Sequence, residues 1–254
     1  MKRVLLVLLS ALVFEGACTE GSEGARDAAT LDLMGGLAGY ALAFDGVQDY
    51  ATAGNAGFPQ AGGEQTLALW VNLTSLSGTQ DFIVLRQDFD NGVQLGIRDG
   101  TVAAWTTYAR TTLAAAPAAP SLGTWHHVAY TYDHTTQRLY LDGNMVATST
   151  ATGDKRTPTS AWLGTVDGAT ELFQGKMDEV RVWTVARTPA ELLTDMLHGT
   201  APGETGLVAY WTFDDTDVGG RCRDSSGLGN DVTLGDGVVA YMPDRVPSDA
   251  PVAP

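Results

Sequence analysis

Apolar and polar residues alternate with a period of two from about residue 39 to residue 185, the spacing of half-buried strands. The segment 66–73 is the clearest, because four apolar side chains share one face: Leu67, Leu69, Val71 and Leu73. Asp99-Gly100 and Asp142-Gly143 separate such segments, and Asp-Gly pairs suit two-residue hairpin turns. Strands without intervening helices predict an all-β fold, an antiparallel sandwich or jelly roll.

The segment 175–193 reads as a strand followed by a short helix. Val180 and Val182 are expected to face the core, with Glu179 and Arg181 at exposed sheet positions. The helix start is marked by Thr188, Pro189 and Glu191, which fit a capping box. The predicted apolar face consists of Leu192, Leu193, Met196 and Leu197. The segment 206–215 is expected to pair back onto the sheet as a terminal strand; the alternative is the remnant of a truncated second repeat.

The first residues predict a secretory leader over 1–17, with Lys2 and Arg3 before a short apolar run. Cys18 follows a Gly-Ala pair, as in bacterial lipoproteins, and is the predicted lipidation site; Glu15 departs from that motif. The alternative for Cys18 is a disulfide with Cys222. We therefore expect a secreted protein or a cell-surface or outer-membrane lipoprotein of a bacterium.

The amino-acid composition predicts three regions in the rest of the chain. The small polar residues of 18–32 predict a flexible tether, 33–245 a single domain, and the Pro-rich segment 246–254 a disordered tail. The formal net charge of −15 argues against nucleic acid and against an anionic membrane surface as direct partners. It is compatible with cations and with neutral sugars, although acidity also serves solubility alone. Oligomeric state leaves no signal in the sequence.

Five segments together resemble the laminin-G-like, concanavalin A-like jelly roll of lectins and glucanases. They are ALAFDGVQDYATAG (41–54), TLALWVNL (66–73), TWHHVAYTYD (124–133), LYLDGNMVA (139–147) and GKMDEVRVWTVARTPAEL (175–192). The resemblance covers roughly residues 41 to 195 and implies the fold more specifically than the ligand. That fold also hosts adhesion modules, pentraxin-like proteins and glucanases.

The resemblance also implies a structural calcium ion. An acid at the start of the DEVRVW-like strand corresponds to Asp178, and the turn after the first strand corresponds to Asp45 and Gly46. Calcium takes carboxylate and carbonyl oxygens, so these residue types are suitable ligands. The alternative for Asp178 is that its carboxylate accepts hydrogen bonds from nearby backbone N–H groups.

A sugar site is expected where aromatic side chains lie near turns. Trp105 and Tyr108 are the predicted stacking residues, and Asp88, Asp90 and Asn91 are the predicted partners of sugar hydroxyls. The alternatives are core packing for the tryptophans and turn chemistry for the acids and the amide.

Catalysis has little support in the sequence. No glutamate begins the ExDxxE pattern of the glucanases of this fold, and no GxSxG elbow is present. We therefore expect a non-catalytic module that binds a glycan or a surface protein. The alternatives are a structural or adhesion module without a small ligand and a divergent glycoside hydrolase. An aromatic-lined face would favour the lectin, and a close carboxylate pair in a deep groove would favour the hydrolase.

Overall fold

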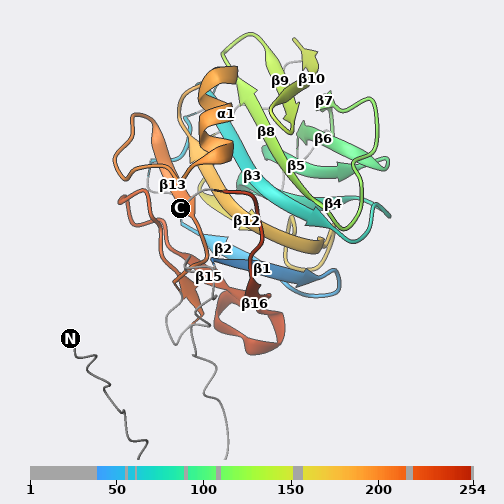
Figure 1. Cartoon of the computed structure of the whole chain (residues 1–254), viewed down its shortest axis with the longest axis vertical. Coiled ribbons are helices and arrows are strands. Elements are labelled where there is room, and N and C mark those ends of the chain that lie inside the picture. Colours follow the sequence, from blue (N-terminus) through green and yellow to red (C-terminus); the bar gives the residue numbers. More distant parts are fainter. Residues whose placement is uncertain are drawn as a thin grey trace, which may run out of the picture.

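The computed structural model describes residues 39–54, 57–60, 62–88, 91–106, 110–150, 157–215 and 220–252. Two antiparallel sheets of eight strands each pack face to face, and one short α-helix lies over one of them (Figure 1). The predicted all-β sandwich with a single helix in the C-terminal third is confirmed. No helix within these ranges is long and apolar enough to cross a membrane.

The first sheet has the order β10-β9-β8-β3-β12-β1-β16, and β13 pairs with one end of β12. Its strands are β1 (Tyr40–Asp45), β3 (Gln65–Leu73), β8 (Trp125–Tyr132), β9 (Gln137–Leu141), β10 (Asn144–Ser149), β12 (Gln174–Trp183), β13 (Leu207–Trp211) and β16 (Asp244–Pro247). The predicted return of the segment 206–215 to the sheet is confirmed by the pairing of β13 with β12.

The second sheet has the order β14-β15-β2-β11-β4-β5-β6-β7. Its strands are β2 (Ala51–Ala53), β4 (Gln80–Asp88), β5 (Asn91–Arg98), β6 (Thr101–Thr106), β7 (Thr112–Ala115), β11 (Ser160–Leu163), β14 (Arg221–Cys222) and β15 (Val232–Leu234). Two short 3-10 turns follow β15: η1 (Gly235–Gly237) and η2 (Val239–Tyr241).

The core lies between the sheets and is formed by one face of each strand. The four apolar residues predicted to share a face of β3 all belong to it, opposite Ile83 and Leu85 of β4. The hairpin turns are also as predicted, since Asp99 and Gly100 have φ of 52° and 77°. Gly92 lies near the start of β5, beside β4. Gly92 is required there because a Cβ would lie 2.2 Å from the carbonyl oxygen of Leu85.

A β-bulge in β12 changes the expected exposure of its charged residues. The register shifts between Asp178 and Arg181, and Glu179 has a φ of 54°. The prediction that Glu179 and Arg181 are exposed is wrong, because both are buried. The extra residue turns their side chains toward the helix-covered face, where Arg181 donates hydrogen bonds to Glu179 and to Tyr210 Oη.

The helix α1 (Pro189–Leu197) begins as predicted. The Thr188 side chain accepts a hydrogen bond from the Glu191 backbone, and the Glu191 carboxylate accepts one from the Thr188 backbone. Its predicted apolar face is only partly correct. Leu192 is buried against the first sheet, whereas Leu193 and Leu197 are exposed. The short helix crosses the sheet surface, so only part of its apolar stripe is covered.

The C-terminal segment corrects another expectation. The predicted disordered tail begins at residue 246, but Val246 and Pro247 belong to β16, which pairs with β1 (Figure 1). Backbone pairing with an edge strand orders a sequence whose composition alone suggests disorder. Cys222 is buried in β14, and Cys18 lies outside the described residues, so lipidation and the alternative disulfide both stay predictions.

Candidate functional site

The residues predicted to bind sugar do not form an accessible site within the described structure. Trp105 is 0% exposed on β6, directly opposite Gln94 of β5, and therefore offers no surface to a ligand. Tyr108 and Asp90 lie outside the described residues, as do the side chains of Asp88 and Asn91. The stacking role predicted for Trp105 is wrong, because its side chain is buried on the outer side of the sheet, where the guanidinium carbon of Arg98 lies 5.7 Å from its ring centroid.

A different set of side chains stands on the outer face of the second sheet. In β2 and β11 the residues that point inward are small or aliphatic, with Ala51 and Ala161 in the core. The residues between them along each strand point outward. On this outer face Thr52 of β2 is paired with Trp162 of β11, and Ser160 of β11 is paired with Arg86 of β4. Strand alternation thus places aromatic, cationic and hydroxyl groups side by side on three neighbouring strands.

These side chains border a hollow of about 440 Å³. Its polar and aromatic lining consists of Thr52, Arg86, Gln87, Ser160, Trp162 and Asp236. Such a volume lies in the range of small-ligand sites, which combine an aromatic wall with a few polar groups.

Aromatic rings form a row beside the hollow. The ring centroids of Tyr50 and Trp162 are 5.7 Å apart, and those of Tyr50 and Tyr241 are 6.0 Å apart, with the planes within 29° of parallel. The guanidinium carbon of Arg86 lies 4.4 Å from the Trp162 centroid. This cation–π contact fixes Trp162, which stays half-buried and in contact with the hollow.

Asp236 supplies the carboxylate of the hollow. It accepts a hydrogen bond of 2.6 Å from Thr52 Oγ1 and one of 3.3 Å from Tyr50 Oη. Burial, together with the negative charge of Asp236, raises the pKa of the Tyr50 hydroxyl, which therefore stays protonated as the donor at neutral pH. The carboxylate itself is exposed and is open to a ligand.

Sequence reasoning did not select this site. Tyr50 and Asp236 meet although 186 positions separate them, and only the pairing of β15 with β2 brings them together. The available local signal was the outward alternation of Tyr50, Thr52, Ser160 and Trp162 around small core residues.

A close carboxylate pair does exist, but away from the hollow. The amide nitrogen Nε2 of Gln94 lies 3.0 Å from both carboxylate oxygens of Asp81 and 2.7 Å from Glu171 Oε2. Burial and the neighbouring charge of Glu171 raise the pKa of Asp81 well above its ordinary value. Asp81 is 0% exposed, so its carboxyl group is closed to a ligand, whereas Glu171 is partly exposed and pairs with Arg110.

The predicted calcium ligands do not come together. Asp45 pairs with Gln174, whereas Asp178 lies four residues farther along β12. Asp45 Oδ1 already accepts hydrogen bonds from the backbone of residues 47, 48 and 49, and a Cβ on Gly46 would lie 2.8 Å from Gln174. This set therefore does not fit one calcium ion. No group of three His, Cys, Asp or Glu side chains suited to a metal occurs among the described residues.

Asp178 has different neighbours from those expected. Its carboxylate accepts hydrogen bonds from the Glu179 backbone and from Ser248 Oγ. Burial raises its pKa to about 8, and the charges of Glu179 and Asp214 act in the same direction. Asp178 therefore has the alternative role, because its carboxylate accepts a hydrogen bond from the backbone N–H of Glu179.

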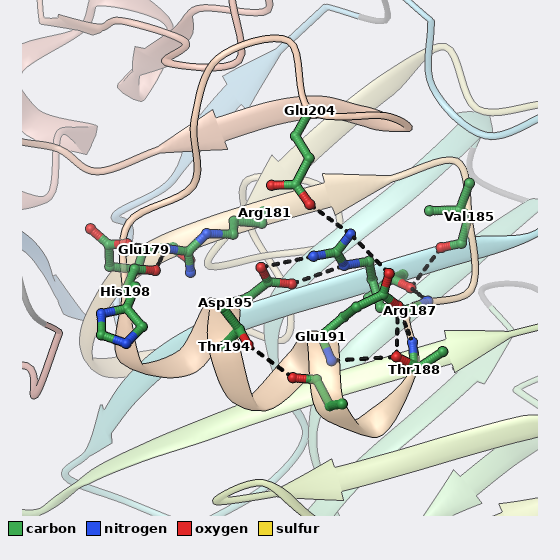
Figure 2. Close-up of polar contacts among 12 residues, drawn as sticks. Glu179, Arg181, Val185, Arg187, Thr188, Glu191, Thr194, Asp195, His198 and Glu204 are labelled. Carbon is green, nitrogen blue, oxygen red and sulfur yellow. Dashed lines mark hydrogen bonds and ion pairs between the residues drawn. The ribbon is translucent and has the colours of Figure 1, made fainter.

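The opposite side of the sandwich is closed by α1 and a buried polar network (Figure 2). Arg187 donates hydrogen bonds of 3.0 Å from Nε and from Nη2 to the two oxygens of Asp195. Arg187 Nη1 also pairs with Glu204 at 2.8 Å, and its guanidinium stacks on Trp183 at 4.1 Å. These contacts fix α1 on the first sheet. Another cavity, whose lining includes Pro59, Tyr130 and Pro158, has a volume of only about 30 Å³, so the hollow on the second sheet is the candidate ligand site.

Comparisons with known proteins agree with this fold. One similar structure is that of a Bacteroides ovatus protein named as a candidate carbohydrate-binding protein. It superposes on this chain with a TM-score of 0.65 and is 22% identical in sequence. The match covers 85% of this chain and 62% of that one. Domain 4 of the extracellular arabinanase AbnA of Geobacillus stearothermophilus, in complex with arabinotriose, superposes with a TM-score of 0.52 and is 21% identical in sequence. That match covers 68% of this chain and 82% of the AbnA domain.

These identities show a shared fold rather than a shared ligand. No curated protein matches the sequence. The family model described as the concanavalin A-like lectin/glucanases superfamily matches residues 45–193, more than half of the 254-residue chain. The protein therefore belongs to the concanavalin A-like lectin/glucanase superfamily, in its laminin-G-like branch.

Proposed function

We propose that the protein is a non-catalytic carbohydrate-binding module of a bacterial cell surface. The hollow on the second sheet carries the proposal, because Trp162 borders it together with hydroxyl, amide, guanidinium and carboxylate groups. Sugars present an apolar ring face and a rim of hydroxyls, and a site with one aromatic wall and several polar groups complements both. The arabinotriose complex of AbnA domain 4 supports a glycan as the ligand class.

The surface location rests on the sequence of the first residues. The predicted leader of 1–17 and the predicted lipid on Cys18 would tether the domain to a bacterial membrane. The burial of Asp81 supports a role in binding rather than in hydrolysis, because one carboxyl of the Asp81–Glu171 pair is closed to a substrate.

Calcium stays a prediction, now centred on Asp178 alone. The pKa of the Asp178 carboxyl is raised by burial and by the nearby negative charges of Glu179 and Asp214. A bound cation would offset this repulsion, and carboxylate oxygens are the ligands it would use.

The test of the proposed function is glycan binding by residues 18–254 on an array, followed by calorimetry. Trp162→Ala should weaken binding by about tenfold or more, since buried tryptophan contacts dominate binding energies. Trp125→Ala is the matched control, because Trp125 is also half-buried but lies on β8 of the first sheet. Equal binding by both variants would contradict the assignment of this site, and binding of surface proteins but no glycan would favour the adhesion module.

A further inference from the structure

The residues that follow β15 contribute to the hollow although they lie outside the part of the chain that matches the family. We call residues 235–241 the C-terminal hook. Its backbone joins Tyr50 at both ends: Gly235 N–H donates to the Tyr50 carbonyl at 2.8 Å, and Tyr50 N–H donates to the Tyr241 carbonyl at 3.1 Å. The hook thereby places Asp236 in the lining and Tyr241 at the end of the aromatic row.

Asp236 is held in an unusual backbone conformation. Its φ is 49°, between Gly235 at 53° and Gly237 at 82°. A Cβ at Gly235 would lie 2.6 Å from the carbonyl carbon of Tyr241, so only glycine allows the hook to close. Aspartate tolerates the left-handed region better than most residues other than glycine, so the hook can hold Asp236 in this conformation. The bonds from Thr52 and Tyr50 fix the carboxylate at the rim of the hollow.

The chemistry of this rim favours hydroxyl groups. An ionised carboxylate can accept about four hydrogen bonds, and Asp236 receives one at each oxygen from the protein. The remaining lone pairs can accept from two adjacent hydroxyls of a sugar. The Thr52 hydroxyl, which donates to Asp236, can still accept, and the Ser160 hydroxyl, which accepts from Trp162 Nε1, can donate.

The charges around the hollow disfavour an anionic ligand. Asp236 is exposed, whereas the cation of the lining, Arg86, is 5% exposed and its guanidinium lies over Trp162. The whole chain carries a net charge of −15, which adds a long-range repulsion of anions.

We propose that the hollow binds neutral glycans with adjacent free hydroxyl groups, and that Asp236 of the C-terminal hook selects them over anionic glycans. This inference rests on the proposed function, because it names the ligand class and the selecting residue of the same site.

The experiment uses residues 18–254 on an array in which neutral oligosaccharides stand beside their sialylated and uronic-acid counterparts. The wild type should bind neutral members. Asp236→Asn keeps the shape and tolerates positive φ but removes the charge, and should weaken this binding by about tenfold, the value of a charged hydrogen bond. The same variant should also reduce the ratio of binding to neutral oligosaccharides over binding to anionic ones. Asp99→Asn is the matched control, because Asp99 is exposed and has a φ of 52°.

The outcomes separate this inference from the proposed function. Anionic oligosaccharides could bind as strongly as the neutral ones or more strongly, with binding still lost in Trp162→Ala. This result would overturn the selection of neutral glycans but not the proposed glycan binding. Equal effects of Asp236→Asn and Asp99→Asn would overturn the role of Asp236. The absence of any Trp162-dependent signal would overturn both.

Discussion

The ion pair beneath α1 leads to a quantitative prediction about burial. Asp195 and Glu204 both bind Arg187, at 3.0 and 2.8 Å, but their side chains are 4% and 36% exposed. Truncating one partner of a buried pair costs about 3 to 5 kcal/mol, because the other charge is left without compensation. Since Glu204 stays beside Arg187, we expect Asp195→Ala to lower the free energy of unfolding by about 3 kcal/mol.

Glu204→Ala is the matched control. Both variants remove a carboxylate from the same guanidinium (Figure 2), but Asp195 is buried and accepts two hydrogen bonds, whereas Glu204 is partly exposed and pairs with Nη1. A partly exposed pair is worth about 1 kcal/mol or less, so this variant should lose no more than that.

Urea unfolding at pH 7 measures both changes, provided that the slope of the transition is unchanged. High salt should reduce the effect of Glu204→Ala and spare that of Asp195→Ala, because buried pairs are screened less. The reasoning would be refuted by an Asp195→Ala cost no greater than that of Glu204→Ala.

Two further predictions concern buried carboxyl groups. Calcium should raise the melting temperature of the wild type relative to EDTA, and this rise should disappear in Asp178→Ala; identical wild-type melting curves would leave Asp178 as a carboxyl bonded to Ser248. For Asp81, burial and Glu171 raise the folded-state pKa, so the folded protein holds a proton that the unfolded chain has released. Its contribution to stability is therefore present below the ordinary pKa of 3.8 and is lost as the pH rises toward the raised value. Asp81→Asn should flatten this decline in unfolding free energies measured from pH 5 to pH 9; parallel wild-type and variant profiles would contradict a raised pKa.

Local sequence determined the elements of this protein. The alternation in β3 follows from which face meets the core, and the cap at Thr188 uses residues within one turn of helix. Both signals act over a few positions, so a single sequence contains them completely. The family segments also predicted the sandwich through their resemblance to a known fold, although the order of strands along the chain does not give the neighbours, since β12 pairs with β1 and β3.

Tertiary structure alone decided which side chains are accessible. Trp105 and Trp162 both stand on outward positions of the second sheet, yet the first is buried and the second borders the hollow. Alternation gives the face of a side chain but not what covers that face. The buried position of Glu179 likewise involves a distant residue, Tyr210 of β13, whose hydroxyl donates to the Glu179 carboxylate because β13 pairs with β12. Asp236 joined the candidate site only because β15 pairs with β2, a contact between distant segments that no local pattern encodes.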